Sequence, residues 1–141
     1  MVVKRRPREN RRSGADIDIF PRDRVAMLVY VESYMNGVIA MVAYRPKPGK
    51  ERELLELVRL RVPTLRKEGL VTDRVPTVMR SRDGTIVEVS EWKSREAIDA
   101  AHKNPNVLAM WEKFFALCEC VPLKTLAEAN DMFAGFEPVA D

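Results

Sequence analysis

His102, the only histidine in the chain, is the residue whose type best suits acid–base chemistry. An imidazole titrates near neutral pH, so this side chain can act as a general base for a phenolic or enolic proton. The structural alternative is that His102 ends a short helix and interacts favourably with the helix dipole or with a loop carbonyl. We therefore take His102 as the catalytic candidate and keep the structural role as its alternative.

Three aromatic residues are candidates for binding a small aromatic ligand. Trp92 and Trp111 can flank a ring, and Tyr44, late on the first predicted strand, can orient a ligand through its hydroxyl. Each of these positions also falls on a predicted core face. Packing in the core is therefore the alternative role for each of them.

Glu88 is a carboxylate with apolar neighbours. Alternation along a strand from Thr85 to Trp92 puts it on the same face as large apolar side chains. A buried carboxylate needs a partner, and Arg80 or Arg74 on the preceding hairpin strand is within reach. One interpretation is a structural ion pair; the other makes Arg80 the partner of a substrate oxyanion.

The two cysteines do not suggest a metal site or a disulfide. Cys118 and Cys120 lie two residues apart in a helical pattern, on different faces, where they cannot bridge each other. Together with one distant histidine they do not form a metal-ligand set. We predict reduced thiols in a cytoplasmic protein, with no metal and no cofactor.

Charge divides the chain into two parts. Basic residues gather at residues 1–12, whereas the chain from Val25 onward is close to neutral. We predict a basic, flexible extension over residues 1–34 and one folded domain over residues 35–141, and Met27 and Met35 are plausible internal starts. Nucleic-acid binding would depend on the extension alone, so we do not expect nucleic acid as a partner. No apolar run approaches the roughly 20 residues that a membrane span needs.

Periodicity predicts the elements of the domain. Val38 to Arg45 alternates as a strand, and Lys50 to Glu68 has a helical apolar stripe, with a kink or break expected near residues 59–62 because of Pro63. A hairpin follows, with strands at Arg74 to Arg80 and Thr85 to Trp92 joined by an Asp-Gly turn.

The second half contains helices and a final strand. Ser94 caps a short helix that ends at Ala101 or His102, and Asn104-Pro105 begins a longer one. Thr125 to Glu128 has the pattern of a capping box, which predicts a short helix to about Met132. Residues 133–139 are predicted as the last strand.

This order is the α+β, ferredoxin-like β-α-β-β-α-β unit, with a four-stranded antiparallel sheet and both long helices on one face. Each strand nevertheless carries apolar residues on both faces. A large apolar sheet face is not tolerated in a soluble monomer, so we expect a second copy of the chain to cover it. The pattern thus predicts a homodimer.

The layout resembles the dimeric α/β-barrel superfamily and, within it, the antibiotic biosynthesis monooxygenase (ABM) domain family. The resemblance covers roughly residues 36–139. Its residues are Glu88, Trp92, Ser94, Ala97 and His102, followed by Asn104-Pro105, Trp111, Val121-Pro122-Leu123 and the segment from Phe133 to Pro138.

The resemblance implies a cofactor-independent monooxygenase that acts on a small aromatic or quinol-like metabolite. His102 would be its base, and Tyr44, Arg80, Glu88, Trp92 and Trp111 would bind the substrate. The alternative is a non-catalytic dimer that binds a small ligand or acts as a stress-associated module. Relatives that degrade haem use a histidine and an asparagine where this chain has Trp111 and Val42, which argues against haem degradation.

Overall fold

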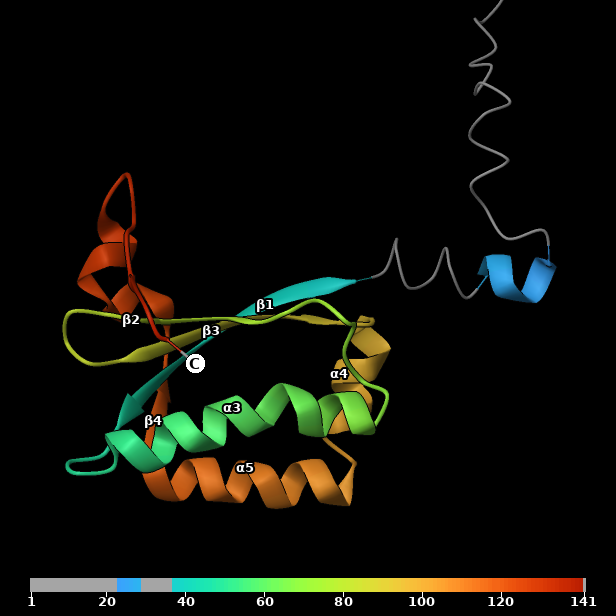
Figure 1. Ribbon diagram of the computed structural model, residues 1–141, viewed down its shortest axis with the longest axis horizontal. Helices are drawn as coiled ribbons and strands as arrows, with labels where there is room; N and C mark the ends of the chain where they lie inside the picture. The colour runs from blue at the N-terminus through green and yellow to red at the C-terminus, as the bar shows by residue number, and fades with distance from the viewer. Residues whose placement is uncertain (1–22, 29–36, 141) are drawn as a thin grey trace, which may run out of the picture.

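One antiparallel sheet organises the fold, in a computed structural model that describes residues 23–28 and 37–140 (Figure 1). Its strands are β1 (Val38–Pro46), β2 (Thr77–Arg80), β3 (Ile86–Trp92), β4 (Cys118–Val121) and β5 (Glu137–Pro138). They lie in the order β4-β1-β3-β2-β5, and every pair of neighbours is antiparallel. The predicted ferredoxin-like α+β fold is confirmed; in this chain the sheet stays open and does not close into a barrel.

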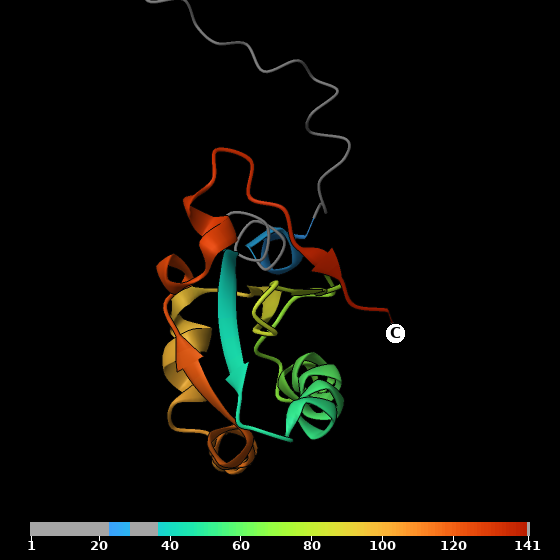
Figure 2. The same ribbon diagram turned by 90° about the vertical axis from the view of Figure 1, so that its left-hand side faces the viewer.

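Two long helices, α3 (Glu51–Lys67) and α5 (Pro105–Leu117), pack on one face of the sheet (Figures 1 and 2). The apolar stripe of α3 is buried there, and α3 runs without a break through Pro63. The predicted break is therefore wrong. Tertiary packing on both sides of Pro63, with Val62 and Leu65 buried, holds the helix together despite the missing N–H.

Local sequence signals place the turns and helix starts as predicted. Gly84 has φ of +91° in the hairpin turn, and its N–H donates to the Ser81 carbonyl at 3.0 Å. Ser94 Oγ accepts the Ala97 N–H at the start of α4 (Arg95–Ala101). Asn104 caps α5 in the same way, directly before Pro105.

The fourth strand of the predicted unit is β4, not the segment over residues 133–139. β4 pairs with the free edge of β1, whereas only Glu137 and Pro138 of the C-terminal segment form a strand, on the opposite edge next to β2. The helix predicted to contain Cys118 and Cys120 is wrong, because both residues lie in β4. Their alternation in an extended strand puts both side chains on the same face.

The predicted helix after Thr125 is also replaced. Two short 3-10 turns, Leu123–Thr125 and Ala127–Asn130, occupy this segment. Thr125 Oγ1 donates to the Pro122 carbonyl at 2.7 Å, and the Glu128 carboxylate accepts from Ser81 Oγ at 2.9 Å and from the Arg82 N–H at 2.8 Å. Because Thr125 and Glu128 have these other partners, no capping box forms.

The C-terminal segment after β4 covers one end of the sheet face opposite the helices (Figures 1 and 2). Leu126 is fully buried there against Ala43 and Val87. Farther along the same face, Ile39 and Met41 are 56% and 46% exposed. We call the uncovered part, around Ile39 and Met41, the open face.

The predicted extension over residues 1–34 lies mostly outside the described residues. Residues 24–28 form a short helix, in which Val25 and Leu28 are exposed. Among the helices that the structure describes, none is both long and apolar enough to span a membrane.

Candidate functional site

The pairing of the strands brings the site residues to the helix-covered face of the sheet. Val42 on β1 pairs with Glu88 on β3, and Tyr44 pairs with Cys120 on β4. Side chains directly opposite each other in a sheet share a face. Strands β1, β3 and β4 therefore direct an aromatic ring, a carboxylate and a thiol, respectively, into the space beneath α3 and α5.

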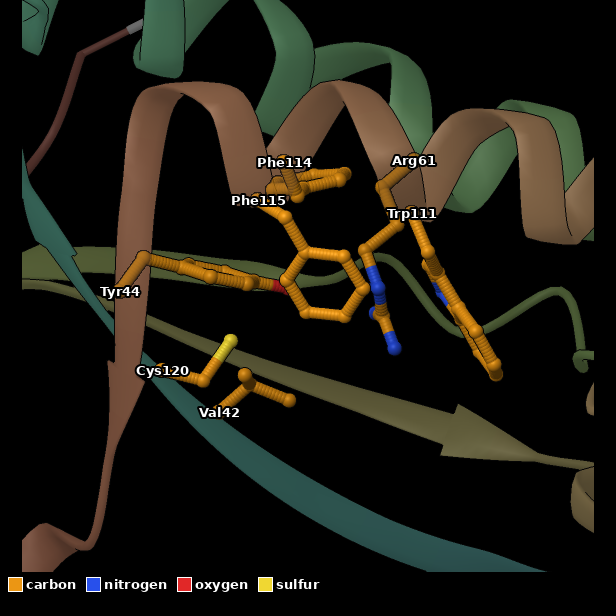
Figure 3. A pocket seen from close by; sticks show the side chains of 7 residues that line it. All are labelled: Val42, Tyr44, Arg61, Trp111, Phe114, Phe115 and Cys120. Carbon is orange, nitrogen blue, oxygen red and sulfur yellow. The ribbon is translucent and has the colours of Figure 1, made fainter.

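A cavity of about 190 Å³ lies in this space (Figure 3). α5 contributes three aromatic rings to its wall, β1 and β4 contribute the floor, and α3 contributes one arginine. Its lining residues are Val42, Tyr44, Arg61, Trp111, Phe114, Phe115 and Cys120. Phe115 is 62% exposed, so the cavity reaches solvent on that side.

Arg61 places a positive charge in this apolar cavity. Its Nη1 lies 2.9 Å from Glu88 Oε1 and 3.3 Å from Ser90 Oγ, and its guanidinium carbon lies 5.6 Å from the centre of the Trp92 ring. Arg61 and Glu88 are both almost fully buried. Within residues 37–140, the hydrogen bonds of this guanidinium all run through Nη1, which leaves the donors of Nε and Nη2 available.

Tyr44 and Glu88 share the same network. The Tyr44 hydroxyl donates to Glu88 Oε1 at 3.0 Å, and its ring stacks on Phe114 with a centroid distance of 5.0 Å. Burial raises the pKa of Tyr44 well above its usual range, so the phenol stays protonated. Burial also raises the pKa of Glu88, against the opposing effects of Arg61 and Tyr44.

One oxygen of Glu88 has no hydrogen-bond partner among the described residues. This atom, Oε2, is buried with its carboxylate, whereas Oε1 accepts from both Arg61 and Tyr44. The predicted ion pair of Glu88 with Arg80 or Arg74 is wrong. Arg80 pairs with Glu51 at 3.1 Å and Arg74 with Glu91 at 3.4 Å, because α3 lies directly over β3 and delivers Arg61 to the carboxylate.

The two cysteines differ in their surroundings. Cys118 is buried, and its Sγ donates to the Phe114 carbonyl at 3.2 Å, whereas Cys120 is exposed and lines the cavity. The interaction with the neighbouring Cys118 and the charge of Arg61 lower the pKa of Cys120, against an opposing effect of burial. The pKa of Cys118 is raised by the same interaction and by burial.

The sequence candidates are divided between the cavity and its surroundings. Tyr44 and Trp111 line the cavity, Glu88 lies behind it, and Trp92 is buried in the core under Arg61. His102 is exposed at the end of α4, and its ring lies edge-on to Trp111 with a centroid distance of 5.0 Å. His102 thus reaches the cavity wall from outside, and its role as base stays a prediction.

Sequence reasoning missed Arg61 and Cys120. Arg61 continues the buried stripe of α3 at the spacing Leu54, Val58, Arg61, Leu65, so a charged residue in an apolar stripe was the available signal. Cys120 carried no such signal, because its segment continues the pattern of α5. Within the described residues, no three histidine, cysteine or acidic side chains form a group that could hold a metal ion.

Comparison with known proteins relates this geometry to a described family. Residues 37–113 match the model of the family "Antibiotic biosynthesis monooxygenase". The structure is similar to that of SnoaB, a cofactor-independent oxygenase from Streptomyces nogalater, with a TM-score of 0.53 and 17% sequence identity over 61% of this chain and 87% of SnoaB. A comparison with curated protein sequences gives no match.

Proposed function

Because the chain belongs to the antibiotic biosynthesis monooxygenase family, we propose that it is a cofactor-independent monooxygenase acting on a small phenol or quinol-like aromatic. The observation that carries this proposal is the aromatic-walled cavity with the Arg61 guanidinium inside it. The fold it shares with SnoaB, an oxygenase described as cofactor-independent, supports the same reaction type. A flat ring fits against Trp111 and Phe115, and its oxygen meets the free donors of Arg61.

Arg61 supplies the electrostatics of the first step. A fixed guanidinium in a site with little water favours the phenolate over the phenol, because an opposite charge at short range lowers the pKa of an acid. The electron-rich phenolate then transfers an electron to molecular oxygen. One oxygen atom ends on the ring carbon and the other leaves as water, so a phenol and one O₂ give a quinone and one H₂O.

His102 is proposed as the acceptor of the phenolic proton. It lies beyond Trp111, so the proton passes through a water at the cavity rim and not through direct contact. Arg61 provides most of the driving force, and the base only removes a proton that the guanidinium has already acidified. Replacing His102 should therefore slow turnover less than replacing Arg61.

We further propose that two copies of the chain pair through the open face. Ile39 and Met41 project from the middle of this face and are about half exposed. An exposed apolar sheet face is typical of a protein–protein interface. The cavity lies on the opposite face of the sheet, so pairing would leave its lining residues free to bind a ligand.

The test is incorporation of oxygen from ¹⁸O₂. One- and two-ring phenols and hydroquinones are incubated with the protein, oxygen uptake is followed, and products are analysed by mass spectrometry. We expect one ¹⁸O atom per product molecule. Arg61→Lys should lose most of the rate, and the matched control Arg45→Lys, which alters an exposed arginine, should retain it.

A second result separates binding from catalysis. Ligand binding in the cavity should quench the fluorescence of Trp111. Quenching by these phenols without oxygen uptake would overturn the monooxygenase and indicate a ligand-binding module. Hydrogen peroxide formed without ¹⁸O in the product would indicate an oxidase instead.

A further inference from the structure

Cys120 combines exposure with a place inside the cavity. Its pairing with Tyr44 across β4 and β1 directs the thiol to the helix-covered face, and Figure 3 shows its sulfur pointing toward the aromatic side chains above the sheet. The neighbouring Cys118 is buried and donates to the Phe114 carbonyl. A ligand in the cavity can therefore reach one sulfur and not the other.

Arg61 is a second feature that points to a ligand in the same space. It is only 5% exposed, lines the cavity, and has free donors at Nε and Nη2 among its contacts within residues 37–140. These donors can bond to a ligand in the cavity while Nη1 stays bound to Glu88 and Ser90. A carbonyl oxygen on a flat ring is an acceptor that the aromatic walls can accommodate.

We propose that Cys120 is a covalent attachment site for quinone-type electrophiles that enter the cavity. The Cys120 thiolate adds to one carbon of the quinone's ring double bond, which forms one C–S bond. The electron pair of that double bond moves onto the oxygen of the carbonyl attached to its other carbon. Arg61 stabilises that oxyanion. Loss of the ring proton and protonation of the oxygen give a hydroquinone thioether, so every atom of the quinone and the thiol is retained.

The surroundings of Cys120 favour this addition. Reactive cysteines lie in electropositive, partly exposed sites, and here the exposed Cys120 lines a cavity that also contains Arg61. The neighbouring Cys118 and the Arg61 charge lower the pKa of Cys120. A lowered pKa raises the fraction of thiolate near neutral pH, and the thiolate is the nucleophile. Because ionisation alone cannot make the rate saturate, a rate of addition that saturates with quinone concentration reports binding in the cavity.

The experiment uses the full chain and 1,4-naphthoquinone under nitrogen. Intact-protein mass spectrometry follows the adduct, and peptide mapping locates it. We expect one added quinone on Cys120, at a rate that saturates with quinone concentration and exceeds that of a free peptide covering residues 116–124. Cys118→Ala should keep the adduct at Cys120, and Cys120→Ser should lose it.

Two results would overturn the proposal. One is a rate that rises linearly with quinone and equals that of the peptide, since no binding would then precede addition. The other is an adduct on Cys118 or on lysines in the wild-type chain. The inference goes beyond the proposed monooxygenase, and ready-made quinone without oxygen makes its outcome independent of the ¹⁸O test.

Discussion

The two faces of the sheet distribute polar and apolar groups in opposite ways. Beneath the helices, Arg61 and Glu88 form an ion pair that is almost completely shielded from solvent. On the open face, Ile39 and Met41 are exposed to it. A buried charge and an exposed apolar patch are the two departures from normal partitioning that carry information about function. The comparison indicates one face for chemistry and the other for association.

The largest effect is expected on the helix-covered face. Glu88→Ala leaves Arg61 as an unpaired buried charge, and such a loss costs about 3–5 kcal/mol of unfolding free energy. Urea denaturation measures it. The matched control Asp73→Ala breaks the exposed pair with Arg66, 3.7 Å apart, and should change stability by less than about 1 kcal/mol.

A double variant sharpens this prediction. Arg61→Met combined with Glu88→Leu removes both charges, so it should recover most of the stability that Glu88→Ala loses. If Glu88→Ala and Asp73→Ala lowered stability by the same small amount, the carboxylate of Glu88 would not be a buried partner of Arg61, and the contrast between the faces would fail.

The next effect is on catalysis. Arg61→Lys keeps a positive charge for Glu88 but loses the planar donors, and loss of one preorganised donor typically lowers kcat about 10²-fold or more. His102→Ala should cost about tenfold or less, because the base contributes only the proton transfer. Steady-state oxygen uptake compares them. A larger loss for His102→Ala would reverse the proposed roles.

A smaller effect is expected on the open face. Met41→Lys places a charge in the proposed dimer interface and should raise the dimer dissociation constant at least about tenfold, equivalent to about 1.4 kcal/mol. Sedimentation equilibrium measures this constant. Leu60→Lys, at a residue of α3 that is 60% exposed, is the matched control and should leave it unchanged. A wild-type chain that sediments as a monomer at every concentration tested would contradict the proposed pairing.

The smallest effect depends on pH and concerns the contact between Glu128 and the hairpin. The N–H of Arg82 and the hydroxyl of Ser81 hold the pKa of Glu128 below its ordinary value. The ionised carboxylate therefore stabilises the fold above pH of about 4.3, and this contribution is lost as pH falls through the lowered pKa. Glu128→Gln should lower the melting temperature at pH 7, and the difference should shrink toward pH 3. A difference in melting temperature that stays the same from pH 7 to pH 3 would contradict a stabilising role of the ionised Glu128 carboxylate.

The sequence predicted the elements whose signals are local. The alternation of β3, the Asp-Gly turn and the caps at Ser94 and Asn104 each follow from a few adjacent residues. The strand β4 was not predicted, because its four residues directly follow α5 and are too few to show an alternation of apolar and polar residues. What makes them a strand is the free edge of β1, which only the tertiary structure reveals.

The same distinction applies to the site. Alternation correctly put Glu88 on a face with apolar residues and required a partner for it. The predicted partners, Arg80 and Arg74, both lie within the sheet, because strand order predicts neighbours across a hairpin but not which helix residue lies above them. Arg61 is 27 residues away in the chain, and its pairing depends on how α3 crosses β3.

The ion pair between Arg61 and Glu88 also bears on how the chain avoids misfolding. Strand β3 has apolar residues on both faces, so hydrophobicity alone would tolerate pairing with β1 displaced by one residue. Such a slip turns every side chain of β3 to the other face. It would carry Glu88 away from the helices and leave Arg61 buried without a counterion. The charge pair thus selects one strand register among several that bury similar amounts of apolar surface. This selection protects the folding chain from mispaired strands that would aggregate.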